Sequence, residues 1–140
     1  MALSIGMITF DSTDPGTLAE WWAEQTGGRI DQDNGGFFYI VALPDSPQRL
    51  GFQKVADPTP GKNRVHLDLG TENLDDEVAR LVAAGATEVH REDMGEFRWV
   101  TVGSAARCHF SVHPTCVFST SCQCLILTNL SESSARSQSR

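Results

Sequence analysis

Apolar and polar residues alternate along two short segments near the middle of the chain, residues 50–55 and 64–69. In the second segment three aliphatic side chains point to one side, whereas His66 and Asp68 point to the other. Alternation with a period of two is typical of half-buried strands. The sequence therefore predicts a polar spot, formed by His66 and Asp68, on the surface of a sheet.

Apolar residues at helical spacing predict two helices. The first begins after Asp14, which can cap it, and carries Pro15 at its first position, where the missing N–H costs nothing. It should end at the glycine pair 27–28. The second helix should begin after Asn73 and end at Gly85.

The remaining periodic segments suggest a weak internal repeat. Further strands are predicted at residues 4–10, 29–31, 37–43, 87–91 and 97–102. Superposing Asn73 on Asp14 aligns two strand–helix–three-strand units and places His66 on Met7. The counterpart of the strand at 50–55 is then expected near residues 109–114.

Composition narrows the class of protein. A chain of 140 residues is long enough for one domain with a real core, and its net charge of -7 argues against a nucleic-acid partner. No apolar run approaches the roughly 20 residues of a membrane-spanning helix. The start of the chain does not resemble a signal peptide, and all cysteines lie between Cys108 and Cys124. We therefore expect a cytoplasmic protein with free thiols and no membrane partner.

The amino-acid composition of the chain changes near Gly103. Of its 18 acidic residues only Glu132 lies beyond that point, and serine becomes frequent. We expect the domain to span residues 1–102, or to reach about 114 if a final strand continues. Residues 115–140 are predicted to be an atypical, partly disordered tail, and a shift of the reading frame near codon 103 is one hypothesis for its origin.

Three stretches carry a resemblance to a known family. Residues 50–55, 61–69 and 97–102 are similar to a glyoxalase-like branch of the vicinal-oxygen-chelate superfamily, the glyoxalase/bleomycin-resistance/dioxygenase type. This resemblance implies an α+β fold of paired βαβββ modules that form a cup-shaped mixed sheet, with an atypical C-terminal segment here. It also implies a small-molecule ligand and a homodimer.

The resemblance carries a metal site over to this chain only in part. His66 matches a metal-ligating His, and Gln53 lies on a strand that often supplies a ligand. Met7 stands where metal-using members have His, and a thioether is a poor ligand for such ions. The usual Glu of the last strand is missing; if residues 108–113 form that strand, His109 and His113 share a face, and either could replace it.

Two functions follow from the resemblance. One is a binding protein without a complete metal site, which holds a small oxygenated or aromatic metabolite or a cationic compound in the cup, as bleomycin-resistance proteins do. The other is a lyase, isomerase or dioxygenase that uses one divalent ion, Zn, Ni, Mn or Fe, held by His66 and Gln53. No catalytic residue is assigned. The ligand-binding candidates are Gln53, His66, Asp68, Tyr39, Trp99 and Met7.

Overall fold

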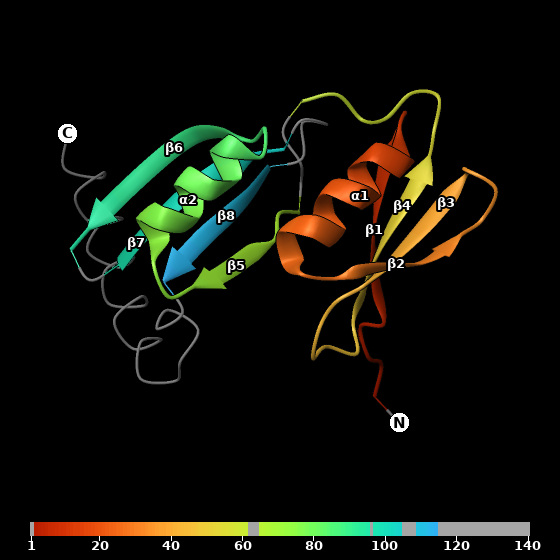
Figure 1. Cartoon of the computed structure of the whole chain (residues 1–140), viewed down its shortest axis with the longest axis horizontal. Coiled ribbons are helices and arrows are strands. Elements are labelled where there is room, and N and C mark those ends of the chain that lie inside the picture. Colours follow the sequence, from red (N-terminus) through yellow and green to blue (C-terminus); the bar gives the residue numbers. More distant parts are fainter. Residues whose placement is uncertain (1, 62–64, 96, 105–108, 115–140) are drawn as a thin grey trace. The chain divides into compact units, whose positions relative to one another are not determined.

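The computed structural model describes residues 2–61, 65–95, 97–104 and 109–114. The chain forms two compact units, Met1–Gly61 and Lys62–Arg140. Each unit has one helix lying across one face of a four-stranded sheet, as Figure 1 shows. Within the described residues, no helix is long and apolar enough to cross a membrane.

The first unit is a strand–helix–three-strand module. It contains β1 (Met7–Ser12), α1 (Pro15–Thr26), β2 (Arg29–Asp33), β3 (Phe38–Ala42) and β4 (Arg49–Lys54). Its strands are ordered β1-β4-β3-β2. β1 and β4 are parallel, whereas the other neighbours are antiparallel, so the sheet is mixed.

The second unit repeats this topology. It contains β5 (Asp68–Thr71), α2 (Leu74–Ala83), β6 (Thr87–Met94), β7 (Phe97–Gly103) and β8 (His109–Pro114). The strand order β5-β8-β7-β6 reproduces that of the first unit, again with one parallel pair, β5 and β8. The two βαβββ modules and the α+β class agree with the fold expected from the sequence.

Both helices begin and end where their capping residues indicate. The Asp14 side chain accepts a hydrogen bond from the Thr17 backbone N–H at 3.3 Å, and α1 ends at Gly27, whose φ of 66° suits glycine. Asn73 caps α2 in the same way through the Asp76 N–H, also at 3.3 Å. Local sequence signals are therefore sufficient to position both helices.

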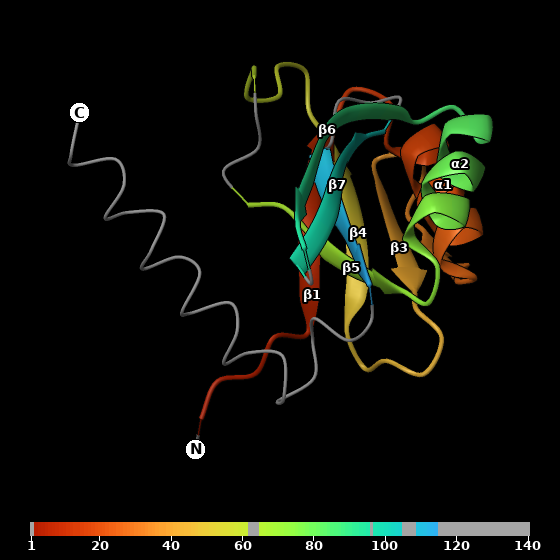
Figure 2. The same cartoon turned by 90° about the vertical axis from the view of Figure 1, so that its left-hand side faces the viewer.

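The core of each unit lies between its helix and its sheet. In the first unit Phe10 stacks on Phe52 and on Trp22 of α1, with ring centroids 5.5 and 6.1 Å apart. In the second, α2 packs on β6, β7 and β8, and Figure 2 shows the helix beside this sheet. The buried residues there are Leu74, Val78, Leu81, Val100, Val102, Phe110 and Val112.

Some expectations differ from the structure or fall outside it, and the strand expected at 4–10 runs from Met7 to Ser12. The strand expected at 64–69 begins only at Asp68 and runs to Thr71, because β5 pairs with β8 from Asp68 onward. β8 occupies the residues where the repeat predicts a final strand. The atypical tail expected at 115–140 lies outside the described residues.

Candidate functional site

The sheet of the second unit has two faces of different character. Val100, Val102, Phe110 and Val112 face α2 and are essentially inaccessible to solvent. Side chains alternate along a strand, so the residues between them point to the other side. We call this other side the polar face; it carries Asp68, His90, Glu92, Trp99, Thr101, His109, Ser111 and His113, with His66 just before β5.

Strand register aligns the polar face in rows across the sheet. Asp68 pairs with Ser111, Ser111 with Thr101, and Thr101 with His90, so these four residues form one row. In the neighbouring row Gly70 pairs with His113, and Trp99 pairs with Glu92. The polar face therefore gathers residues that are far apart in the sequence.

A carboxylate and two imidazoles meet at one end of this face. His113 Nε2 donates a hydrogen bond to Asp68 Oδ1 at 3.1 Å, because an ionised carboxylate can only accept. His66 Nε2 lies 3.5 Å from the same oxygen. The His113 side chain is almost fully buried, whereas His66 and Asp68 keep 48% and 45% of their side-chain exposure. Asp68 thus anchors a buried histidine and remains accessible itself.

An aromatic pair continues the face toward β6. Trp99 stacks on His113, with ring centroids 6.5 Å apart and an interplanar angle of 23°. Next to Trp99, Glu92 Oε1 lies 2.7 Å from His90 Nε2, and both side chains are exposed. The indole is therefore placed between two acidic residues, Asp68 and Glu92, on different strands.

His109 adds a buried polar atom to this face. Its Nδ1 is inaccessible to solvent, and no described residue forms a hydrogen bond with it. Buried polar atoms in proteins nearly always have a partner, so an orphaned nitrogen calls for an explanation. A ligand or a water molecule at the polar face is one such explanation.

Arginines gather on the opposite, helix-covered side. Arg91 contacts Asp75 of α2 at 2.6 Å and Glu88 at 2.9 Å, and Arg98 contacts Asp75 at 3.4 Å. Hydrogen bonds from Arg91 hold the pKa of Glu88 and of Asp75 below their ordinary values. In α2, Arg80 lowers the pKa of Glu77 in the same way. The pairs of Asp75 with Arg91 and Arg98 tie α2 to the sheet, and none of the described arginines of this unit lies on the polar face.

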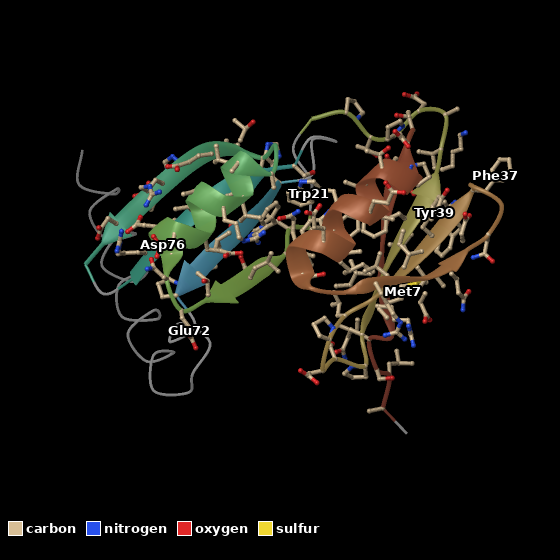
Figure 3. All side chains as sticks on the ribbon, viewed as in Figure 1. Met7, Trp21, Phe37, Tyr39, Glu72 and Asp76 are labelled. Atoms are coloured by element: carbon tan, nitrogen blue, oxygen red, sulfur yellow. The ribbon has the colours of Figure 1, made fainter. Side chains whose placement is uncertain are left out.

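The candidates from the first unit lie on both sides of its sheet. Met7 and Gln53 point away from α1: Met7 Sδ lies beside Gly51, and Gln53 pairs with Asp11. Tyr39 lies on the helix side, with its ring against Gly16 in the first turn of α1 (Figure 3). Within this unit the structure therefore brings Met7 and Gln53 to the same face and places Tyr39 on the other.

In the second unit, His66, His113 and Asp68 contact one another instead of pointing at a common empty position. Two imidazoles and a carboxylate are suitable ligands for Zn, Ni, Mn or Fe. Here, however, both Nε2 atoms are directed at a single carboxylate oxygen. Across the described part of the chain, no three His, Cys, Asp or Glu side chains are arranged to hold an ion.

Comparison with known proteins identifies the family. The glyoxalase-like domain matches residues 7–112, which include both helices and all strands except the last two residues of β8. The chain belongs to the glyoxalase-like domain family. No curated protein matched the chain.

Solved structures of this superfamily share the fold at low identity. A variant of the fosfomycin resistance protein FosX from Listeria monocytogenes, complexed with Mn(II) and a dihydroxypropylphosphonic acid, has a TM-score of 0.68 and 14% identity, covering 81% of this chain and 90% of its own. TnmS3, an antibiotic binding protein from Streptomyces sp. CB03234, has a TM-score of 0.63 and 19% identity over 81% and 98%. Lactoylglutathione lyase from Agrobacterium tumefaciens has a TM-score of 0.63 and 10% identity over 85% and 98%. Because these sequence identities are low, the comparisons show that the chain shares the fold of these proteins and nothing more.

The sequence pattern did not identify all residues of the polar face. His90 and Glu92 were not singled out, although their spacing of two places them on one face of a strand. The signal was weak, because β6 is irregular between Glu88 and His90. His113 was recognised as a residue that could replace the missing Glu, but its pairing with Asp68 depends on β8 lying beside β5.

Proposed function

We propose that this glyoxalase-like protein binds a small aromatic or oxygenated metabolite on the polar face of its second unit, without a metal ion. The observation that carries the proposal is the Asp68–His113–Trp99 arrangement, a hydrogen-bonded carboxylate and imidazole with an indole stacked beside them. Small-molecule sites combine an apolar or aromatic surface with a few fixed polar groups. The orphaned His109 Nδ1 supports the same reading.

Trp99 makes this proposal testable by fluorescence. Three aromatic probes of similar size, 1-methylquinolinium, quinoline and 1-naphthoate, are titrated at pH 8 into the full-length protein with and without EDTA. We expect at least one probe to quench tryptophan emission with an unchanged Kd in EDTA. Trp99→Phe should remove most of the quenching and weaken binding about fivefold, given the ~1 kcal/mol of an aromatic pair.

A matched variant controls for quenching elsewhere. Trp21→Phe removes an indole from the first unit, where Trp21 contacts Trp22 edge-on, and should leave the titration unchanged. Quenching that persists in Trp99→Phe but disappears in Trp21→Phe would move the binding site to the first unit and refute the proposal.

A metal-dependent lyase, isomerase or dioxygenase is the second candidate. The observation that favours it is the presence of two imidazole nitrogens within 3.5 Å of one carboxylate oxygen, since these are the donor types that such ions bind. This candidate requires His66 to act as a ligand. Calorimetric titration with Zn²⁺, Ni²⁺ and Mn²⁺ decides between the two: tight uptake that His66→Ala abolishes would favour the metal enzyme.

We also propose that the protein forms a homodimer and is located in the cytoplasm. The family resemblance supports a homodimer, and the acidic composition supports a cytoplasmic protein without a nucleic-acid partner. Light scattering coupled to size-exclusion chromatography measures the mass directly, and a mass near twice the 15.3 kDa of one chain is expected.

A further inference from the structure

We infer that Asn34 is a site of spontaneous deamidation, a modification in which the folded chain itself converts the Asn34 side-chain amide into a carboxylate. The inference concerns the first unit and is independent of the proposed function. It follows from the sequence and the hydrogen bonds of one exposed turn, which joins β2 to β3 (Figure 1).

In this turn Asn34 is followed directly by two glycines. Asn34 and Gly35 are both exposed to solvent. Gly35 and Gly36 have φ values of 65° and 78°, and the Phe37 N–H donates a hydrogen bond to the Asn34 carbonyl oxygen at 3.3 Å. Two consecutive positive φ values are typical of a type I′ turn between antiparallel strands. Because glycine has no Cβ, no side chain at position 35 hinders an attack by its backbone nitrogen.

The nucleophile of the reaction is the backbone nitrogen of Gly35. Within the described part of the chain, the Gly35 N–H donates to no acceptor, whereas the Gly36 N–H donates to Asp33 Oδ1 at 2.9 Å. A hydrogen bond from the Gly35 N–H would have to break before the nitrogen could attack. The nucleophile is therefore available without unfolding of the turn.

The electrophile is Asn34 Cγ, whose amide is held by one long hydrogen bond. Asn34 Nδ2 donates to the Phe38 carbonyl oxygen at 3.3 Å, and this contact is exposed. The Asn34 backbone N–H donates to the same oxygen at 2.9 Å, so Phe38 keeps a partner when the side chain leaves. Water can replace an exposed side-chain hydrogen bond at little cost. The Asn34 side chain is therefore able to rotate toward the Gly35 nitrogen.

The reaction needs only water as a co-reactant. The Gly35 nitrogen forms a bond to Asn34 Cγ, the Cγ–Nδ2 bond breaks, and Nδ2 leaves as ammonia with the proton of the Gly35 N–H. Water then opens the resulting cyclic imide. Cleavage between Gly35 N and Asn34 Cγ yields aspartate, whereas cleavage between Gly35 N and the Asn34 main-chain carbonyl carbon yields isoaspartate. Nothing is oxidised or reduced in either step.

Either product alters the turn. A carboxylate has no proton to donate, so the side-chain hydrogen bond to Phe38 is lost, and a negative charge is added beside Asp31 and Asp33. Isoaspartate also adds a methylene to the main chain between β2 and β3, whose pairing register depends on the turn. We therefore expect the modification to loosen β2, which is an edge strand of its sheet.

Peptide mass spectrometry of the full-length protein, stored at neutral and at mildly alkaline pH, tests the site. The internal control is Asn73, which precedes the bulky Leu74 and accepts a hydrogen bond from the Asp76 N–H as the cap of α2. We expect Asn34 to be converted at least about tenfold faster than Asn73, a difference of ~1.4 kcal/mol in activation free energy. Conversion should be faster at alkaline pH, because the Gly35 nitrogen must lose its proton.

A variant and a second readout make this test specific. Asn34→Gln keeps an amide but would have to close a larger ring, and it should remove the modification from this turn. Methyl transfer by an enzyme that accepts isoaspartate but not aspartate should label the stored protein and not the stored Asn34→Gln variant. Circular dichroism of the unstored variant confirms that it is folded.

The same protein in urea shows whether the folded turn permits the reaction. We expect the rate at Asn34 in the folded protein to lie within about tenfold of the rate in urea. Conversion that occurs only in urea would show that the turn protects Asn34 and would overturn the inference. Equal rates at Asn34 and Asn73 in the folded protein, or labelling that persists in Asn34→Gln, would overturn it as well.

Discussion

One carboxylate oxygen of Asp68 contacts two histidines, so replacing Asp68 affects a buried and an exposed imidazole together. We expect Asp68→Ala to lower the free energy of unfolding by about 1–3 kcal/mol, because the His113 Nε2–H loses its acceptor in a buried position. Urea unfolding followed by circular dichroism measures this change.

The control for this prediction is a second His–acid pair on the polar face, in which both side chains are exposed to solvent. Glu92 and His90 lie 2.7 Å apart, but 57% of the His90 side chain is open to water. Glu92→Ala should therefore change stability by less than ~0.5 kcal/mol. Equal losses in Asp68→Ala and Glu92→Ala would show that the hydrogen bond to Asp68 does not stabilise the fold.

Just after α1, the backbone at Gly28 lies so close to β3 that there is no room for a side chain. A Cβ at this position would lie 2.5 Å from the Ala42 carbonyl oxygen and 3.3 Å from Val41 Cγ1. Gly28→Ala should therefore destabilise the protein by about 2–3 kcal/mol through overpacking. Gly6→Ala, where a Cβ meets no atom within 4 Å, should be nearly neutral in the same urea titration. A neutral Gly28→Ala would mean that the turn after α1 and strand β3 are not packed this closely.

At the scale of elements, carboxylates of α2 and of β6 pair with arginines of the same element. The pKa values of Glu77 and Glu88 are lowered in the folded protein by hydrogen bonds to Arg80 and Arg91. Their stabilising effect is complete above the ordinary pKa of 4.5 and is lost as the pH falls through the lowered folded values. The free energy of unfolding should therefore decrease as the pH falls below about 4.5.

Substitution of both acids tests this assignment. The double variant Glu77→Gln, Glu88→Gln should show a flatter dependence of stability on pH in that acidic range than the unmodified protein. Glu24→Gln is the control, since no described arginine contacts Glu24. An unchanged slope in the double variant would assign the acid sensitivity to other carboxylates.

Elements were predictable where the signal was local. Asp14, Pro15 and Gly27 for α1, and Asn73 for α2, act within a few residues of the helix ends, and the structure uses them. The start of β5 was placed four residues early, at residue 64 instead of Asp68. Alternation showed which residues share a face, but not where pairing with β8 begins.

At the scale of the whole molecule, the repeat was visible because both units have the same order of elements. Superposing Asn73 on Asp14 anticipated β8 at residues 109–114 and hence the identical strand order of the two sheets. The candidate site was less predictable. His66, Asp68 and Trp99 lie on the polar face, but Tyr39 packs against α1, because its strand turns that side chain toward the helix.

There is a physical reason why the faces of the strands could be predicted from the sequence and the position of Tyr39 could not. A residue's face follows from the period of its strand, whereas the side that a helix covers depends on tertiary packing. The contact between Asp68 and His113 spans 45 positions and forms through the parallel pairing of β5 with β8. No local pattern encodes such a contact.

The central claim is metal-independent binding on the polar face of the second unit. The most direct test is a set of amide NMR spectra of the ¹⁵N-labelled full-length protein in EDTA, recorded during a titration with 1-methylquinolinium. We predict saturable shifts concentrated around Asp68, Trp99 and His113, with little change across the first unit. Shifts that appear only after Zn²⁺, Ni²⁺ or Mn²⁺ replaces EDTA, or that lie only in the first unit, would contradict it.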